Sequence, residues 1–112
     1  MGDEDLKHKK EEWLKKVKAE GKMKDPTEDH KFGLKALQNP TRRNILKSMA
    51  KGSMDYSDLK EKFGLDDVQA KLHLNFLEEA LYIEKKEKDG DFQYYLTPRG
   101  EAYLENDEKE KK

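Results

Sequence analysis

Apolar residues recur at helical spacing along most of the chain and change to strand-like alternation only near residue 82. The first helical stripe lies within residues 6–19, where the apolar positions among lysines and glutamates are Leu6, Trp13, Leu14 and Val17. Two interpretations are open: the helix is solvated and partly formed, or it docks on a partner subunit through these four residues. The single tryptophan favours docking, because an ordered helix rarely leaves an indole ring in water.

Two more helices are expected between the helix-breaking pair Asp25-Pro26 and Gly52. Thr27 is expected to cap the first of them, which runs to about residue 38. Asn39-Pro40 starts the second, since asparagine caps helices and proline suits the first helical position. The apolar residues at core spacing in the two helices are Phe32, Leu34, Leu37, Ile45, Leu46, Met49 and Ala50.

A helix-turn-helix pattern follows a brief strand expected at residues 54–56. Ser57 is expected to cap a short helix over residues 58–63 that ends at Gly64. Asp66 then caps a longer helix from 67 to about 81. Two helices joined by a tight, glycine-containing turn are typical of the helix-turn-helix motif.

A β-hairpin and a last helix complete the pattern. Residues 82–88 and 92–96 read as two strands joined by Asp89-Gly90, a strong hairpin signal. Tyr94 and Tyr95 point to opposite faces of their strand, so one is core and the other is available to DNA or a partner. Thr97-Pro98 starts the final helix. This order predicts a mainly α fold with a small antiparallel β-hairpin wing, the winged helix-turn-helix.

Composition divides the chain into three parts. Residues 1–26 are a charged, partly helical N-terminal segment, residues 27–104 the winged-helix domain, and residues 105–112 a disordered charged tail. Charged residues make up 44% of the chain, yet the formal net charge is only −1. This balance argues against an ordinary DNA-binding protein, because contacts to phosphates supply most of the non-specific affinity.

The sequence lacks the residue patterns of enzymes and metal sites. It has no cysteine, its three histidines do not share metal-ligand spacing, and no nucleophile or phosphate-loop motif is present. We therefore expect neither catalysis nor a metal or other cofactor. No apolar run approaches the ~20 residues that span a membrane. The expectation is a cytoplasmic protein without a membrane partner.

Three segments resemble a known family. Residues 36–46 (ALQNPTRRNIL) and 63–83 (FGLDDVQAKLHLNFLEEALYI) resemble the opening and the helix-turn-helix of ArsR-type winged-helix transcriptional regulators. Residues 95–100 (YLTPRG) resemble the end of their wing. The resemblance covers about residues 33–104, and it suggests an archaeal source. It implies a homodimer that places the helix over about 67–81 in the major groove of double-stranded DNA, with the wing 83–96 near the backbone.

The same resemblance assigns DNA contacts position by position. The residues expected to face the groove are Gln69, Lys71, Leu72, His73 and Asn75. Glutamine and asparagine can pair with adenine edges, and lysine can reach guanine or phosphate. The residues expected to contact phosphates, which set register but carry no sequence information, are Arg42, Arg43, Ser57, Lys85, Lys86 and Lys88.

This chain departs from the family pattern in its recognition helix. Val68, Leu72 and Phe76 form a second apolar line, and two interpretations are open: Val68 and Leu72 rim the core, or they form a protein-binding face. His73 either packs against a neighbouring helix or contacts DNA. Leucine at position 81, where the family usually has glycine, predicts a different helix ending.

The sequence is therefore consistent with two alternative functions. The first is a dimeric DNA-binding transcriptional regulator whose specificity comes from Gln69, Lys71 and Asn75. The alternative is a winged-helix protein–protein interaction module with little or no DNA affinity, which the balanced charge and the acidic, leucine-bearing recognition helix favour.

Overall fold

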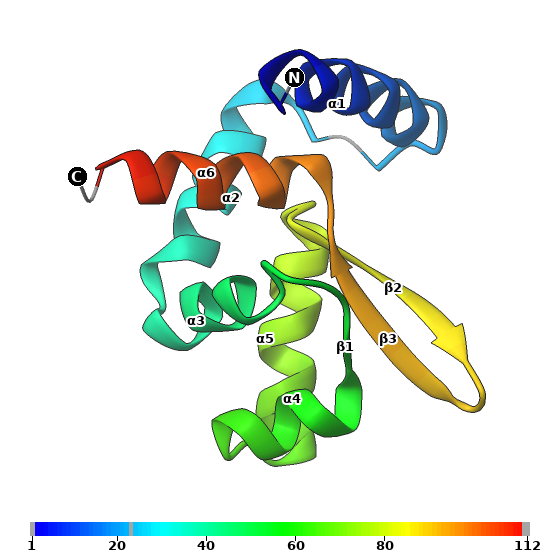
Figure 1. Cartoon of the computed structure of the whole chain (residues 1–112), viewed down its shortest axis with the longest axis vertical. Helices are drawn as coiled ribbons and strands as arrows, with labels where there is room; N and C mark the ends of the chain where they lie inside the picture. The colour runs from blue at the N-terminus through cyan, green and yellow to red at the C-terminus, as the bar shows by residue number, and fades with distance from the viewer. Residues whose placement is uncertain (1, 23, 111–112) are drawn as a thin grey trace.

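Six helices and a three-stranded antiparallel sheet make up residues 2–22 and 24–110, the part of the chain that the computed structural model describes. In chain order the elements are α1 (Gly2–Ala19), α2 (Pro26–Gln38), α3 (Pro40–Ser48), β1 (Met54–Asp55), α4 (Tyr56–Phe63), α5 (Asp67–Glu79), β2 (Ile83–Lys88), β3 (Asp91–Leu96) and α6 (Pro98–Glu110). The winged helix-turn-helix that the sequence predicted is confirmed. Figure 1 shows α4 at one end of the molecule and α1 and α6 at the other, with α5 between them and the β2–β3 hairpin extending sideways.

Side-chain caps fix several helix starts where the sequence placed them. The Asn39 carboxamide oxygen accepts hydrogen bonds from the backbone N–H groups of Thr41 and Arg42, at 2.8 and 3.2 Å. Asp66 and Gln69 form a reciprocal capping box at the start of α5. Each cap satisfies backbone donors of the first turn that have no partner within the helix.

Two predicted caps were wrong. Asp25, two residues before Thr27, caps α2, because its carboxylate accepts from the backbone N–H groups of Thr27 and Glu28 at 3.0 and 3.1 Å. Pro26 follows at the first helical position. α4 begins at Tyr56, so Ser57 lies inside the helix and is not its cap.

The sheet has the order β1-β3-β2. β3 pairs with β1 through Met54↔Tyr94 and with β2 along its whole length, from Ile83↔Leu96 to the turn. Both turn residues, Asp89 and Gly90, have positive φ (52° and 82°), as the predicted two-residue hairpin requires.

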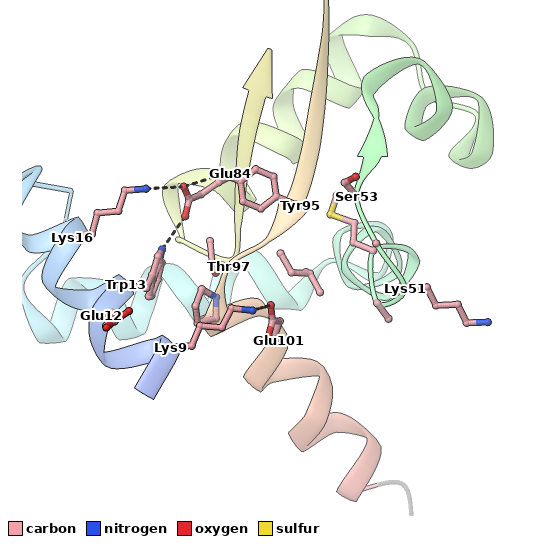
Figure 2. A pocket seen from close by; sticks show the side chains of 15 residues that line it. Lys9, Glu12, Trp13, Lys16, Lys51, Ser53, Glu84, Tyr95, Thr97 and Glu101 are labelled. Carbon is pink, nitrogen blue, oxygen red and sulfur yellow. Dashed lines mark hydrogen bonds and ion pairs between the residues drawn. The ribbon is translucent and has the colours of Figure 1, made fainter. Parts of the chain in front are cut away.

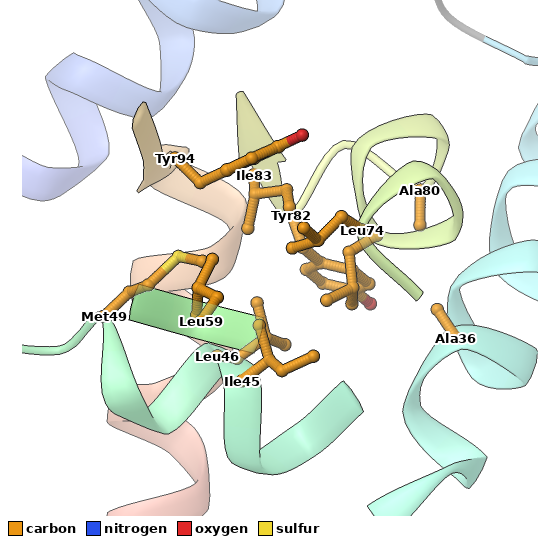
Figure 3. Packing of buried hydrophobic residues seen from close by; sticks show 11 residues of the cluster. Ala36, Ile45, Leu46, Met49, Leu59, Leu74, Ala80, Tyr82, Ile83 and Tyr94 are labelled. Atoms are coloured by element: carbon orange, nitrogen blue, oxygen red, sulfur yellow. The ribbon is translucent and has the colours of Figure 1, made fainter. Parts of the chain in front are cut away.

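The main core lies where α3, α4, α5 and the sheet meet (Figure 3). Its fully buried large side chains include Ile45, Leu46, Leu59, Leu74, Leu77 and Ile83. Leu34 and Ala50, predicted to be core residues, are exposed. α2 packs through Gly33 and Ala36, and Leu34 lies more than 90° round the helix from the middle of that face.

α1 docks on its own chain, an arrangement that neither interpretation of its apolar stripe included. Trp13 (7% exposed) and Val17 (3%) are buried with Leu81 in a second small cluster. The indole Nε1 donates a hydrogen bond to Glu84 Oε1 at 2.9 Å. Leu14 is half-buried against the same cluster, and the side chain of Leu6 lies outside the described residues.

Replacing Trp13 with alanine is expected to reduce the free energy of unfolding by about 2 kcal/mol, because the substitution undocks a single peripheral helix. Trp13→Phe should cost about 1 kcal/mol, since it keeps an aromatic ring and loses the hydrogen bond to Glu84. The measurement is urea unfolding followed by circular dichroism at fixed protein concentration. Equal midpoints for wild type and Trp13→Ala would contradict the docked position of α1.

The end of α5 explains why leucine is tolerated at position 81. Leu81 adopts a φ of 66°, the left-handed conformation that glycine favours. The N–H groups of Leu81 and Tyr82 close the helix by donating to Glu78 and Leu77 carbonyls, both at 3.0 Å. The prediction of a different helix ending was therefore wrong. Left-handed backbone costs a leucine about 1 kcal/mol, and burial of its side chain under α1 offsets this.

α6 is longer than predicted. It continues through Glu110, so the structure is helical at residues 105–110, where the sequence predicted a disordered tail; residues 111 and 112 lie outside the described part. Near its start, Arg99 forms a two-point ion pair with Asp29 of α2 (2.8 and 2.9 Å) and donates to the Ala80 carbonyl at 3.1 Å. The boundary of the winged-helix domain at residue 104 stays a prediction.

Candidate nucleic-acid interface

The helix-turn-helix consists of α4 and α5, joined by a turn in which Gly64 has a φ of 61°. Two side chains of α4 hold the first residue of α5: Tyr56 Oη and Lys60 Nζ both donate to the Asp67 carboxylate, at 3.0 and 2.7 Å. These hydrogen bonds lower the pKa of Asp67. The acidic start of the recognition helix is thus partly neutralised from within the motif.

The exposed face of α5 is centred on apolar residues. Ala70, Leu74 and Leu77 face the core. On the opposite side, Val68 is 77% and Leu72 60% exposed. The interpretation that these two side chains rim the core is therefore wrong.

Three polar residues of the predicted groove-facing set share this exposed side of α5. Lys71 and Asn75 are exposed beside Leu72. Gln69 is also exposed, but its side-chain oxygen accepts from the backbone N–H of Asp66 at 3.3 Å. A base contact through that oxygen would compete with the cap, so Lys71 and Asn75 are better placed than Gln69 for the predicted base contacts.

His73 is held by the neighbouring helix, which confirms the packing interpretation. Arg42 Nε donates to His73 Nδ1 at 3.3 Å, and the Arg42 guanidinium lies 4.1 Å from the centre of the Phe76 ring. Phe76 stacks in turn on Phe32 of α2, with ring centroids 4.5 Å apart. Arg42 and His73 therefore lock α3 against α5.

The pKa of His73 is lowered, first because burial disfavours the charged imidazolium and second because Arg42 is positively charged. In the unfolded chain histidine titrates near its ordinary value of about 6.5. The unfolded state therefore binds the proton first as the pH falls. The stability linked to His73 is fully present above about pH 6.5 and is lost as the pH falls through the lowered folded pKa.

We therefore expect the melting temperature of the wild type to fall more steeply between pH 7 and pH 5 than that of His73→Gln. Glutamine can still accept the hydrogen bond of Arg42 but does not titrate. The exposed His30 offers a matched control, and His30→Gln should keep the wild-type profile. Parallel profiles for wild type and His73→Gln would remove His73 as the source of the pH dependence.

Two more of the predicted phosphate contacts have partners inside the chain. Arg43 Nη1 donates to the Leu37 carbonyl at 2.7 Å, as Arg42 Nη1 does to the Lys35 carbonyl at 3.1 Å. Carbonyls in the last turn of a helix lack helical partners, so these two arginines act as a cap for α2. Ser57 donates to the Asp91 carboxylate at 3.2 Å and joins α4 to the wing.

The wing carries its lysines on β2. Lys86 and Lys88 are exposed, whereas Lys85 lies 5.0 Å from the Phe92 ring centre and 4.0 Å from a carboxylate oxygen of Glu78. Of the two tyrosines on β3, Tyr94 is in the core, and burial raises its pKa to about 12. Tyr95 is partly exposed, which agrees with the prediction that the two tyrosines point to opposite faces of the strand.

Glu84, at the base of the wing, is a residue that sequence reasoning missed. Its carboxylate accepts from Trp13 and from Tyr95 Oη (3.5 Å), and Lys16 lies 3.9 Å away (Figure 2). It borders a groove of about 900 Å³ between α1, the α3–β1 loop and the base of the wing. The partners of Glu84 lie far apart in the sequence, so no local sequence pattern predicts these contacts.

The described part of the chain shows neither a metal-binding cluster nor a membrane-spanning helix. Among residues 8–22 and 24–107, whose side chains the structure describes, no group of three His, Asp or Glu side chains is arranged to hold a metal ion. None of the helices has the length and apolar character needed to cross a bilayer. The absence of a metal in the working protein stays a prediction.

Comparison with known proteins agrees with this architecture. The family model described as bacterial regulatory protein, arsR family, matches residues 39–85. The transcriptional repressor SdpR of Bacillus subtilis is 39% identical over 61 residues, which span 54% of this chain and 67% of that protein.

Solved structures show the same fold. A homodimeric winged helix-turn-helix DNA-binding domain from Mycobacterium bovis has a TM-score of 0.63 at 21% identity, covering 73% of this chain and 80% of its own. NolR from Sinorhizobium fredii has a TM-score of 0.64 at 25% identity, covering 71% and 81%. An archaeal source for this chain stays a prediction.

Proposed function

The chain belongs to the ArsR family of winged-helix transcriptional regulators, and we propose that it binds duplex DNA with α5 in the major groove and the β2–β3 wing near the backbone. Proteins of this family regulate transcription and are not enzymes, and neither is this chain. Because its target is DNA, we propose that it acts in the cytoplasm.

The observation that supports this proposal best is the free face of α5. Val68, Leu72 and Asn75 point away from the core. The hydrogen bonds that Tyr56 and Lys60 of α4 donate to Asp67 hold the start of the helix. In helix-turn-helix proteins the N-terminal half of the second helix contacts base edges. A helix that is held in place by α4 and exposes its outer face is suited to contact base edges.

The proposed contacts fall into two groups. Lys71 and Asn75 are the base readers, with Lys71 also able to reach a phosphate and Gln69 as a further candidate if its cap opens. Lys86 and Lys88 of the wing are the phosphate contacts, since their ammonium groups are exposed. We assign Arg42, Arg43, Ser57 and His73 to the scaffold that positions α5 and the wing, because each already has a hydrogen-bond partner within the chain.

We also propose that the protein works as a homodimer, as the Mycobacterium bovis domain is described to be. Two-fold symmetry would place two copies of α5 in major grooves one helical turn apart, about 34 Å. Trp13 and Val17 are buried within their own chain, so a dimer contact at α1 would use other side chains, such as the half-buried Leu14. Sedimentation of Leu14→Glu tests this, since a dimer with an unchanged dissociation constant would exclude Leu14.

The experiment that tests DNA binding is fluorescence anisotropy of a labelled mixed-sequence duplex, repeated from about 20 to 200 mM salt. Each phosphate neutralised adds about 0.9 to the slope of log affinity against log salt. Two wing lysines and Lys71 from each of two subunits predict a slope of about five. Absence of binding at the lowest salt would refute the proposal.

Two observations favour a second candidate, a protein–protein interaction module. The exposed Val68 and Leu72 interrupt the polar surface of α5, and the formal net charge of the chain is −1. The same titration separates the two functions, because a protein-binding module would leave the duplex free at every salt concentration.

A further inference from the structure

The outermost side chains on the N-terminal half of α5 are apolar. At 100° per residue, Val68 and Leu72 lie 40° apart and directly opposite the core line of Ala70, Leu74 and Leu77. They are 77% and 60% exposed, more than any other large apolar side chain described. Water therefore covers two aliphatic groups at the centre of the helix face that would enter the major groove.

The major groove offers an aliphatic side chain one apolar partner. Base edges there carry hydrogen-bond donors and acceptors, and only thymine adds a methyl group, at C5. Seating Val68 or Leu72 against donors and acceptors would leave those polar groups desolvated and unpaired. When the same side chains contact a thymine methyl group, apolar surface is removed from water on both partners and no polar group is left unpaired.

Helix geometry relates the two positions to the base sequence. Four residues advance about 6 Å along an α-helix, and successive base pairs are about 3.4 Å apart. Val68 and Leu72 are thus separated by roughly two base-pair steps. Asn75 lies one turn further along on the same face, and its amide suits adenine.

We propose that Val68 and Leu72 are specificity-determining residues that contact the C5-methyl groups of thymines about two base pairs apart in each half-site. This inference rests on the proposed function and adds the chemistry by which α5 reads its target. Two side chains beside Lys71 cover far less than the about 800 Å² that each partner of a standard protein interface buries, so the apolar pair by itself favours a base contact over a protein partner.

The test begins with selection of preferred duplexes from a random pool by the wild-type protein. Thymines should be enriched within each half-site about two base pairs apart. Each such thymine is then replaced by deoxyuridine, which removes the methyl group and leaves base pairing unchanged. Loss of one methyl contact should weaken binding about fourfold, or about 15-fold when both half-sites are changed.

Variants then assign each methyl to a side chain. In Leu72→Ala the deoxyuridine penalty should vanish at one thymine position and persist at the other, and Val68→Ala should show the reverse pattern. Leu34→Ala removes an exposed leucine of α2 and should keep both penalties. All three side chains are exposed, and equal melting temperatures will establish that each variant is folded.

The outcomes separate this inference from the function on which it rests. Absence of duplex binding by the wild type would overturn the proposed function, and Val68 and Leu72 would then be assigned to contact with a protein partner. Binding without a deoxyuridine penalty, or selected sites without thymine in the half-sites, would overturn methyl readout alone. A penalty that persists in both Val68→Ala and Leu72→Ala would place methyl recognition on another residue and also overturn it.

Discussion

A protein carrying both Lys71→Glu and Lys86→Glu is expected to lose at least about 100-fold in affinity for duplex DNA while keeping its thermal stability. Lys71 lies on the outer side of α5 and Lys86 on the wing, and both are exposed. In a dimer the double substitution removes four cationic contacts and places four carboxylates near phosphates. The slope of log affinity against log salt should fall by about four.

The control for this prediction is Lys15→Glu with Lys18→Glu. Both lysines are exposed on α1, which Figure 1 places at the opposite end of the molecule from α4. Each pair changes the formal net charge by −4, from −1 to −5. Anisotropy titrations that show equal losses for the two variants would mean that overall charge, not the helix-turn-helix, governs binding.

Gly100→Ala is expected to destabilise the fold by about 3 kcal/mol, although alanine is normally favoured over glycine in a helix by about 1 kcal/mol. A Cβ at position 100 would overlap the backbone carbonyl oxygen of Tyr82 and lie 3.0 Å from Leu96 Cδ2. That carbonyl is fixed, because it accepts the N–H of Thr97 at 3.0 Å. The start of α6 would have to move off the core.

Gly33→Ala is the matched control, since it is the same substitution in a helix that also faces Tyr82. There the new Cβ would lie 3.1 Å from the Tyr82 hydroxyl, the movable end of a side chain. Its effect on urea unfolding should stay within about 1 kcal/mol. A Gly100→Ala midpoint equal to that of Gly33→Ala would refute the close approach of α6 to Tyr82.

Features that depend on a few consecutive residues could be read directly from the sequence. Asn39-Pro40, the Asp66 cap and the Asp89-Gly90 turn all form as predicted. In each of them a side chain or a permitted φ acts on backbone groups at most three residues away. The order of elements, and with it the family resemblance, followed from these signals and from the apolar spacing.

Exposure on α2 and α5 could not be read in this way. Leu34 and Leu72 have the same side chain and similar helical spacing to core residues, yet both are exposed. Periodicity gives the direction in which a side chain points from its helix, but the side chain is buried only if another element packs against that face. The assignment of Val68 and Leu72 to the rim of the core failed for this reason.

Contacts between distant segments decided the remainder of the candidate site. Sequence similarity assigned Arg42 and His73 to DNA, whereas packing of α3 on α5 joins them to each other across 31 positions. The bond between Trp13 and Glu84 spans 71 positions and docks α1 on its own chain. Short-range chemistry therefore specified the helices, the turns and the wing. Which polar groups stay available for a partner was settled only when the folded chain brought distant donors and acceptors within hydrogen-bonding distance.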